Sequence, residues 1–245
     1  MRERRVIVAE PRIERRDDGG DQGSRIVGHA AVFDIWYSLY EGRYWSYREI
    51  VRPGAFRRAI REKQDVRSLF NHDMNYVLGR TASRTLTLRE DETGLYSETL
   101  APPTDTIRDL VIAPIERGDI TGMSFSFAPV RSDETKEKVK DGVTTITTKG
   151  ERITIRYEGE KRIEERELLD LDLYDVGPVT FPAYDTTDVG VRSAYCPSLE
   201  ARAREMDRPH RRHAPRREEL ARWLSGSRDP ATPTSSAVRP ERVGS

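Results

Sequence analysis

The chain has 245 residues, of which 36% are hydrophobic and 34% charged, a composition that predicts one compact core accompanied by poorly ordered polar segments. Its 42 Lys and Arg balance 42 Asp and Glu, which argues against a global electrostatic attraction to nucleic acid or to a membrane. Cys196 is the single cysteine, so an internal disulfide is excluded and a reducing compartment is expected. No apolar run approaches about 18 residues and no apolar signal segment follows Met1, so the sequence predicts a soluble protein.

Short apolar runs in the first part of the chain predict strands. The predicted strands cover residues 6–9, 25–33, 49–54 and 66–70, followed by a hairpin of residues 85–89 and 94–100. Ala55, Phe56, Ala59 and Ile60 recur at helical spacing with arginines on the opposite face, which predicts a short amphipathic helix. The aromatic-rich segment 36–47 is expected to pack over the sheet.

The second half of the chain contains a further helix and a charged insertion. Thr104 or Asp105 can cap a helix that ends at Gly118, and Pro114 is expected to shorten or bend its last turn. Residues 131–162 combine a charged run with alternating segments, which predicts a surface β-hairpin insertion. The chain therefore divides into an N-terminal strand and loop (1–23), a main domain (24–192) and a flexible tail rich in Arg, Pro and Ser (193–245).

The stretch Ile120–Phe127 alternates apolar with small or hydroxylated residues, which is the pattern of a strand. One face then carries Ser124 and Ser126, and the other carries Met123, Phe125 and Phe127. One interpretation is a half-buried strand whose serines face water. The other takes the serines together with His72, which lies in a short polar break in an apolar run. A serine and a histidine on neighbouring strands can serve as nucleophile and general base.

A catalytic histidine also needs an acid that holds its imidazole in one tautomer. The strand after the insertion offers Asp170, Asp172 and Asp175, and spacing alone does not choose among them or between the two serines. No metal or cofactor is predicted, because two of the four histidines lie in an arginine-rich tail and no second cysteine exists. Phosphate-loop, dinucleotide and Gly-x-Ser-x-Gly motifs are absent from the sequence.

Seven stretches of the chain carry a family pattern when they are taken together and in order. They are Gly28–Phe33, Glu49–Phe56, Asn71–Asp73, Leu78–Arg80, Gly94–Leu95, Gly122–Phe127 and Asp175–Tyr184. They resemble the prohead maturation proteases of tailed bacteriophages, whose fold is similar to that of the herpesvirus assemblins, and the resemblance covers about residues 24–192. It implies a mainly β fold with peripheral helices (α+β) and an assemblin-like closed β-barrel.

The resemblance also implies roles for individual residues. His72 matches the family's general base and Ser124 its nucleophile, whereas Ser126 stands where the family often has glycine. The acid seven residues before Gly177 matches the third member best, and this acid is Asp170, with Asp175 as the alternative. Gly177 itself departs from the pattern, which usually has serine there. Backbone N–H groups near residues 178–180, together with an arginine such as Arg80, are expected to stabilise the oxyanion.

A protease of this family implies a defined set of partners. The expected substrate is the scaffold portion of the major capsid protein precursor, inside a procapsid that assembles in the cytoplasm of a bacterial host. Self-cleavage and a homodimer are compatible with the resemblance, whereas a membrane is not expected. The main alternative is a non-enzymatic capsid-assembly or scaffold-binding protein. A third interpretation makes residues 202–222 a nucleic-acid arm, but their interleaved acids and lack of aromatic residues argue against it.

Overall fold

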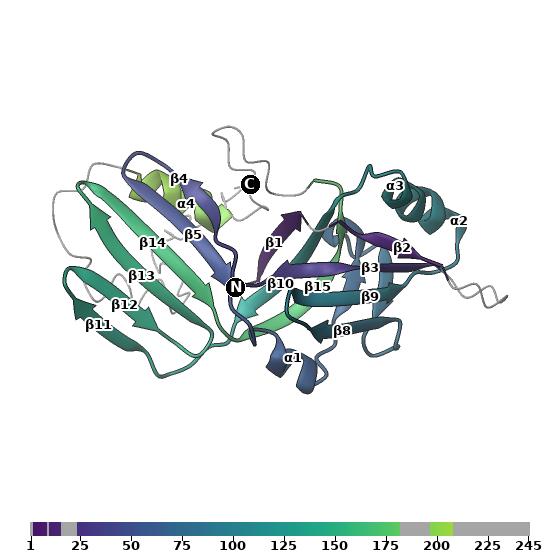
Figure 1. The fold of residues 1–245 in the computed structure, drawn as a ribbon, viewed down its shortest axis with the longest axis horizontal. Coiled ribbons are helices and arrows are strands. Elements are labelled where there is room, and N and C mark those ends of the chain that lie inside the picture. The colour runs from purple at the N-terminus through teal and green to yellow at the C-terminus, as the bar shows by residue number, and fades with distance from the viewer. Residues whose placement is uncertain (1, 9, 16–23, 182–196, 208–245) are drawn as a thin grey trace, which may run out of the picture. The chain divides into compact units, whose positions relative to one another are not determined.

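The computed structural model describes residues 2–8, 10–15, 24–181 and 197–207 (Figure 1). The described strands form three sheets, joined by a few short helices. This is the mainly β architecture with few helices that the sequence predicts. Of the tail predicted to be flexible (193–245), residues 193–196 and 208–245 lie outside the described residues.

The first sheet has five strands in the order β1-β10-β15-β6-β7. Its strands are β1 (Glu3–Val8), β6 (Arg67–Leu69), β7 (Val77–Arg80), β10 (Gly122–Pro129) and β15 (Leu171–Val179). Strand β10 is antiparallel to both of its neighbours, and β15 pairs with β6 in parallel. Segments from the beginning, the middle and the late part of the chain therefore lie side by side in this sheet (Figure 1).

The other two sheets have four and six strands. The second sheet, in the order β2-β3-β9-β8, contains β2 (Arg12–Glu14), β3 (Arg25–Val32), β8 (Leu86–Glu90) and β9 (Gly94–Leu100). The third sheet, in the order β11-β12-β13-β14-β5-β4, contains β4 (Tyr37–Glu41), β5 (Trp45–Val51), β11 (Lys136–Lys140), β12 (Val143–Thr147), β13 (Glu151–Glu158) and β14 (Lys161–Leu168). The hydrogen-bonded order of the described strands makes three open sheets, so strand pairing alone does not show the expected closed barrel.

The segment predicted as a single hairpin insertion (131–162) forms β11, β12 and β13 of the third sheet and the first two residues of β14. The chain makes two successive hairpins here, β11–β12 and β13–β14, and β14 pairs in parallel with β5. The inner strands β12 and β13 pack through isoleucines, since Ile146, Ile153 and Ile155 are buried. Every residue of β11 is exposed. The charged run of this segment thus contains the outermost strand of the sheet, β11.

The described helices are short. They are α1 (Arg57–Arg61), the 3₁₀ turn η1 (Phe70–His72), α2 (Asp105–Ile107), the π-helical turn η2 (Arg108–Ile112), α3 (Ala113–Glu116) and α4 (Pro197–Met206). Thr104 caps α2 as predicted, because its hydroxyl accepts a hydrogen bond from the Ile107 N–H at 3.4 Å. Within the described residues, no helix is long and apolar enough to cross a membrane.

Helix α4 lies in the segment that the sequence predicts to be part of a flexible tail. Its Ala203 is buried in a cluster with Leu39, Trp45 and Tyr47 of the third sheet. Just after the helix, Asp207 accepts hydrogen bonds from the backbone N–H groups of Tyr44 and Trp45, at 2.7 and 3.2 Å. These tertiary contacts, which local periodicity does not reveal, explain why the helix is ordered.

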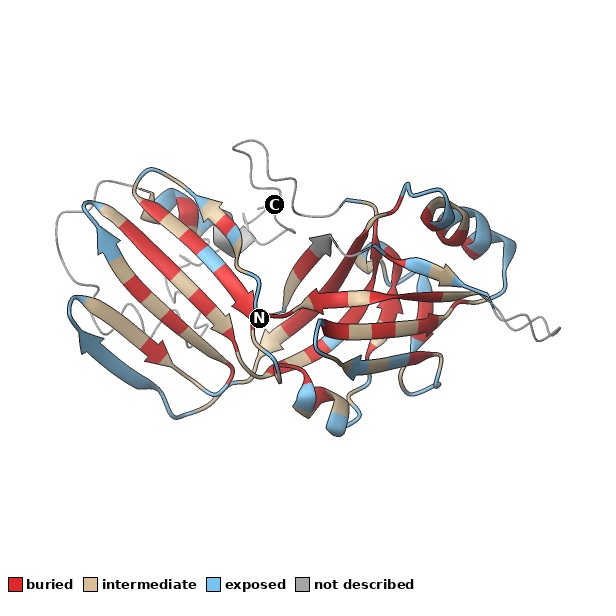
Figure 2. Ribbon diagram, in the orientation of Figure 1, coloured by how far each residue is buried: buried red, intermediate tan, exposed pale blue. Residues whose placement is uncertain are grey.

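The main core lies between the first and second sheets. Figure 2 shows that β10 and β15 are buried over most of their length. Phe125 packs edge-to-face against Phe56 and stacks with Phe127, with ring centroids 5.5 and 5.1 Å apart. Such rings bury large apolar areas, so β10 is fixed on one face by its aromatic side chains.

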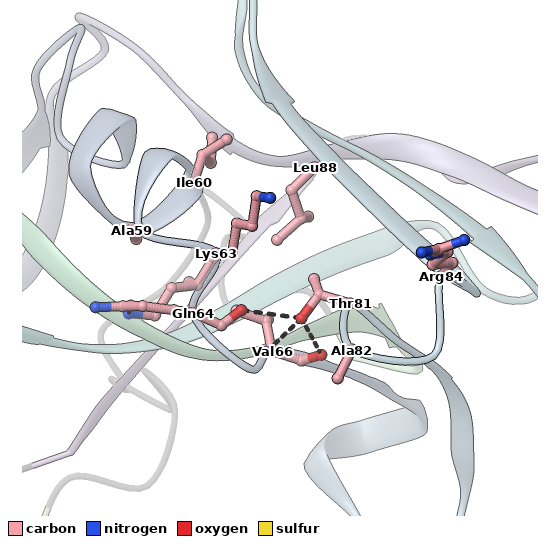
Figure 3. A pocket seen from close by; sticks show the side chains of 10 residues that line it. Ala59, Ile60, Lys63, Gln64, Val66, Thr81, Ala82, Arg84 and Leu88 are labelled. Carbon is pink, nitrogen blue, oxygen red and sulfur yellow. Dashed lines mark hydrogen bonds between the residues drawn. The ribbon is translucent and has the colours of Figure 1, made fainter.

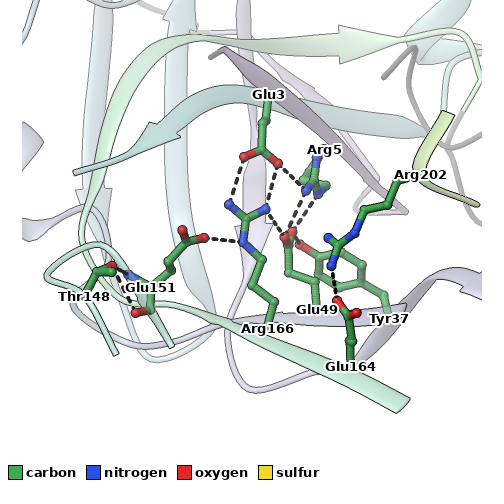
Figure 4. A network of polar contacts seen from close by, with 9 residues as sticks. All are labelled: Glu3, Arg5, Tyr37, Glu49, Thr148, Glu151, Glu164, Arg166 and Arg202. Atoms are coloured by element: carbon green, nitrogen blue, oxygen red, sulfur yellow. Dashed lines mark hydrogen bonds and ion pairs between the residues drawn. The ribbon is translucent and has the colours of Figure 1, made fainter. Parts of the chain in front are cut away.

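A buried cluster of charges joins β1 to the third sheet (Figure 4). Arg5 donates hydrogen bonds to Glu49 at 2.6 and 2.9 Å. Arg166 donates to Glu3 at 2.8 Å, to Glu49 at 2.9 Å and to Glu151 at 2.5 Å. Burial by itself would raise the pKa of Glu3, but the two guanidinium groups outweigh it and hold that pKa well below its usual range. The cluster therefore remains charged and fixes Glu3 and Arg5 on the side of β1 that faces the third sheet.

Candidate active site

Strand β10 presents its serines on the face opposite its aromatic side chains. Met123, Phe125 and Phe127 belong to the main core, as the alternation predicts. Ser124 and Ser126 are also fully buried, with 0% of either residue exposed. The interpretation in which these serines face water is therefore wrong, and each hydroxyl needs a protein partner.

His72 reaches this face from a strained turn at the end of β6. Asn71 and His72 have φ angles of 54° and 57°, a left-handed conformation that is uncommon outside glycine. The Asn71 amide donates to the Thr180 hydroxyl at 3.0 Å and accepts from the Thr180 N–H at 2.9 Å, which fastens the turn to the end of β15. His72 Nε2 lies within hydrogen-bonding distance of Ser124 Oγ. The predicted pair of serine and histidine is thus brought together.

The other imidazole nitrogen faces Asp175. His72 Nδ1 lies 2.5 Å from Asp175 Oδ1, and the two side chains are 8% and 1% exposed. Asp175 lies opposite Ser126 in the pairing of β15 with β10, whereas Leu173 lies opposite Phe127. Tyr174 is therefore an extra residue, a β-bulge that turns Asp175 toward the face that carries the serines.

Asp170, the best match from the resemblance, lies in a different environment. Arg58 donates to its carboxylate at 2.8 Å and to that of Asp172 at 2.6 Å. Gln64 also donates to Asp172 at 2.8 Å; burial would raise the pKa of Asp172, but these donors outweigh it and lower the pKa. The structure does not bring Asp170 to His72, because Asp170 precedes β15 and its carboxylate is bound by Arg58 of α1.

Two further residues named from the sequence lie as follows. Arg80, considered for the oxyanion, forms an exposed ion pair with Asp65 at 2.6 Å. Gly177 lies opposite Ser124 on β15, and a Cβ added there would come within 2.0 Å of the Leu69 carbonyl oxygen. The absence of a side chain at Gly177 therefore lets the end of β6, which carries His72, approach β15.

Replacing Gly177 with Ala is expected to separate His72 from its partners. The added methyl group would overlap the Leu69 backbone, so the turn must move and the free energy of unfolding should fall by about 1 to 3 kcal/mol. Urea unfolding and the peptide cleavage rate would measure both effects. Gly28→Ala is the matched control, because a Cβ there meets its nearest neighbours at ordinary distances of 3.4 to 3.7 Å. Wild-type cleavage by Gly177→Ala would show that this close approach is not needed.

The Ser124 hydroxyl has one hydrogen and two neighbouring acceptors. Its Oγ lies 2.7 Å from the Arg5 carbonyl oxygen, to which it can donate, and it also lies beside His72 Nε2. When His72 is neutral and its Nδ1–H points to Asp175, Nε2 carries a lone pair that can take the Ser124 proton. When His72 is protonated, Nε2 can only donate, and the Ser124 hydrogen turns to Arg5. The arrangement can therefore activate the serine only with a neutral imidazole.

A pocket of about 420 Å³ is lined by α1 and the segment after it, the loop between β7 and β8, β8 and β15 (Figure 3). Thr81 at its wall donates to the Gln64 carbonyl oxygen at 2.9 Å and accepts from the Val66 N–H at 2.9 Å. The residues that line this pocket include none of Ser124, His72 and Asp175. The pocket is thus a feature separate from the serine site.

One comparison with known proteins assigns the chain to a family. A family model described as caudovirus prohead serine protease matches residues 11–201, a range that contains Ser124, His72 and Asp175. Comparisons with curated proteins and with solved structures give no significant match. The family match favours the peptidase over the non-enzymatic assembly protein that the sequence left as an alternative. The chain therefore belongs to the caudovirus prohead serine proteases, and it is a serine peptidase of phage capsid maturation.

Proposed function

We propose that this protein is an endopeptidase that cleaves the scaffold portion of its capsid precursor with a triad of Ser124, His72 and Asp175. The observation that carries the proposal is the chain of contacts from Ser124 Oγ through the two nitrogens of His72 to Asp175. These three residues come from β10, η1 and β15, which are far apart in the sequence. The family match supplies the class of substrate.

The contacts support a distinct role for each side chain in acyl transfer. His72 Nε2 takes the Ser124 proton as Oγ attacks the peptide carbonyl, and Asp175 stabilises the imidazolium that forms. His72 then gives the proton to the leaving amine, so that the peptide C–N bond breaks and Ser124 carries the acyl group. A water molecule, deprotonated by the same imidazole, hydrolyses the acyl-enzyme and restores Ser124.

The proposal includes the place of action and the finer fold. The protease acts inside the procapsid, assembled in the host cytoplasm, and it also cuts its own chain beyond residue 193.

The first and second sheets together correspond to an assemblin-like barrel. Two contacts support this: Thr99 of β9 donates to Ser68 of β6 at 2.9 Å, and Gly28 of β3 lies beside Met123 of β10.

Covalent labelling tests the proposed nucleophile. The full chain would be treated with a fluorophosphonate, which reacts with activated serines, and the labelled residue would be located by peptide mass spectrometry. We expect one label on Ser124, lost in Ser124→Ala and in His72→Ala and kept in Ser126→Ala. In parallel, each form would be mixed with the cognate capsid precursor and followed by intact mass. Labelling at Ser126, or precursor cleavage by Ser124→Ala, would refute the proposed triad.

A further inference from the structure

Arg2, which directly precedes β1, reaches across β10 to the acid of the site. Its Nε donates to Ser126 Oγ at 2.6 Å, and its Nη2 forms an ion pair with Asp175 Oδ2. The guanidinium also lies over the ring of Tyr174, 4.8 Å from the centroid. Three side chains at the bulge of β15 and on the serine face therefore hold this one guanidinium.

Asp175 needs a positive partner when His72 is neutral. Its side chain is 1% exposed, and an isolated buried carboxylate is strongly disfavoured. The described structure gives Asp175 two ion-pair partners, His72 on Oδ1 and Arg2 on Oδ2, and only the arginine carries its charge throughout the reaction. Arg2 therefore supplies the countercharge in the state in which Ser124 is about to be deprotonated.

The charge cluster of Figure 4 holds Arg2 in place. Glu3, the next residue along the chain, binds Arg166 through both carboxylate oxygens at 2.8 Å. Successive side chains of a strand point to opposite faces, so anchoring Glu3 toward the third sheet directs Arg2 toward the serine face. Although 45% of the Arg2 side chain is exposed, the backbone that presents it is fixed.

We propose that Arg2 is a positioning residue of the protease, which supplies a countercharge to the buried Asp175 carboxylate and holds its Oδ1 toward His72 Nδ1. In this role Ser126 is the second anchor of the guanidinium. This explains why a second buried hydroxyl lies near Ser124 although the proposed chemistry does not use it. The inference deepens the proposed function and rests on it. It adds to the site a residue that lies outside the range matched by the family model.

Cleavage kinetics of full-length variants test the role of Arg2. In Arg2→Ala, kcat for a peptide substrate that spans a cleavage site of the precursor should fall about 10- to 100-fold, because a charge-assisted contact to the Asp175 carboxylate is lost. KM should change little. Added guanidinium ion at millimolar concentration should restore part of this rate, and it should not restore Asp175→Asn. Arg4→Ala is the matched control: Arg4 lies on β1 opposite Ser126, and the described residues show no ion pair for it.

A competing electrostatic effect gives the experiment a clear opposite outcome. The positive charge of Arg2 also weakens the stabilisation that Asp175 gives to the imidazolium. If Arg2 had no positioning role, this effect alone would remain, and removing Arg2 would speed the reaction. Faster or unchanged cleavage by Arg2→Ala would overturn the inference. Loss of rate in Arg4→Ala equal to that in Arg2→Ala would also overturn it, since it would reflect net charge.

A spectroscopic measurement separates the failure of this inference from the failure of the proposed function. In the Ser124→Ala background, the proton on His72 Nδ1 should give a downfield NMR resonance, because it is hydrogen-bonded to the Asp175 carboxylate. We expect Arg2→Ala to shift or broaden it and Arg4→Ala to leave it unchanged. This readout needs no substrate. If the wild type cleaves nothing, the proposed function fails, while an unchanged resonance in Arg2→Ala would refute the positioning role by itself.

Discussion

Replacing Asp175 with Asn is expected to lower kcat for precursor cleavage about 10,000-fold with little change in KM. Arg2 can only donate hydrogen bonds, so the amide oxygen of the new residue would face Arg2 and its NH2 group would face His72. The imidazole would then accept at Nδ1 and carry its proton on Nε2, the tautomer that cannot take the Ser124 proton. Single-turnover and steady-state assays with a precursor peptide would measure the loss.

The matched control for this prediction is Asp170→Asn. Asp170 binds Arg58 and does not contact His72, so this variant should cleave at close to the wild-type rate. A 10,000-fold loss in Asp170→Asn together with an active Asp175→Asn would restore the assignment that the family resemblance gave. Equal and moderate losses in both variants would show that neither carboxylate orients the imidazole.

Replacing Arg166 with Met is expected to destabilise the protein by about 3 to 5 kcal/mol. Its side chain is 5% exposed and binds Glu3, Glu49 and Glu151, so its removal leaves one fully buried and two largely buried carboxylates with Arg5 as the remaining cation of the cluster. Breaking a buried ion pair from one side leaves charges without compensation, which costs more than the intact pair contributes. Urea unfolding at neutral pH would measure the change in free energy.

Arg152→Met provides the control for this stability prediction. Arg152 lies on β13, next to β14, which carries Arg166; its side chain is 43% exposed and pairs with Glu167 at 3.2 Å. An exposed pair of this kind contributes at most about 1 kcal/mol. If Arg152→Met and Arg166→Met lost similar stability, burial of the charge cluster would not be the cause.

The serine strand could be predicted from the sequence because its alternation is regular. A period of two places Phe125 in the core and Ser124 on the opposite face of the strand. His72 stands out as a candidate base because it lies in a polar break in an apolar run. Asp175 could not be chosen, because regular alternation from Leu173 places it on the core side. Only the extra residue, Tyr174, reverses the side on which Asp175 lies. A bulge depends on the pairing with β10, which no local pattern in β15 records.

Tertiary pairing also explains why the third sheet and Arg2 were not predicted. The hairpins of residues 136–168 have clear turn signals, but the parallel pairing of β14 with β5 joins segments that are distant in the sequence. Arg2 is one of many arginines in a charged chain, and its contact with Asp175 spans 173 positions. Such contacts depend on where the folded backbone brings side chains, whereas periodicity reports only the local backbone.

The long-range pairing of β1, β10 and β15 has a consequence for the timing of folding. The contact between Arg5 and Ser124 spans 119 positions, and that between His72 and Asp175 spans 103. Folds dominated by such non-local contacts form slowly, in milliseconds to seconds. A ribosome that adds about 5 to 20 residues per second needs on the order of ten seconds or more to reach β15. The nascent chain thus carries the proposed nucleophile, Ser124, before the residues of the proposed triad have come together, and proteolysis by this triad cannot begin before synthesis of the domain is nearly complete.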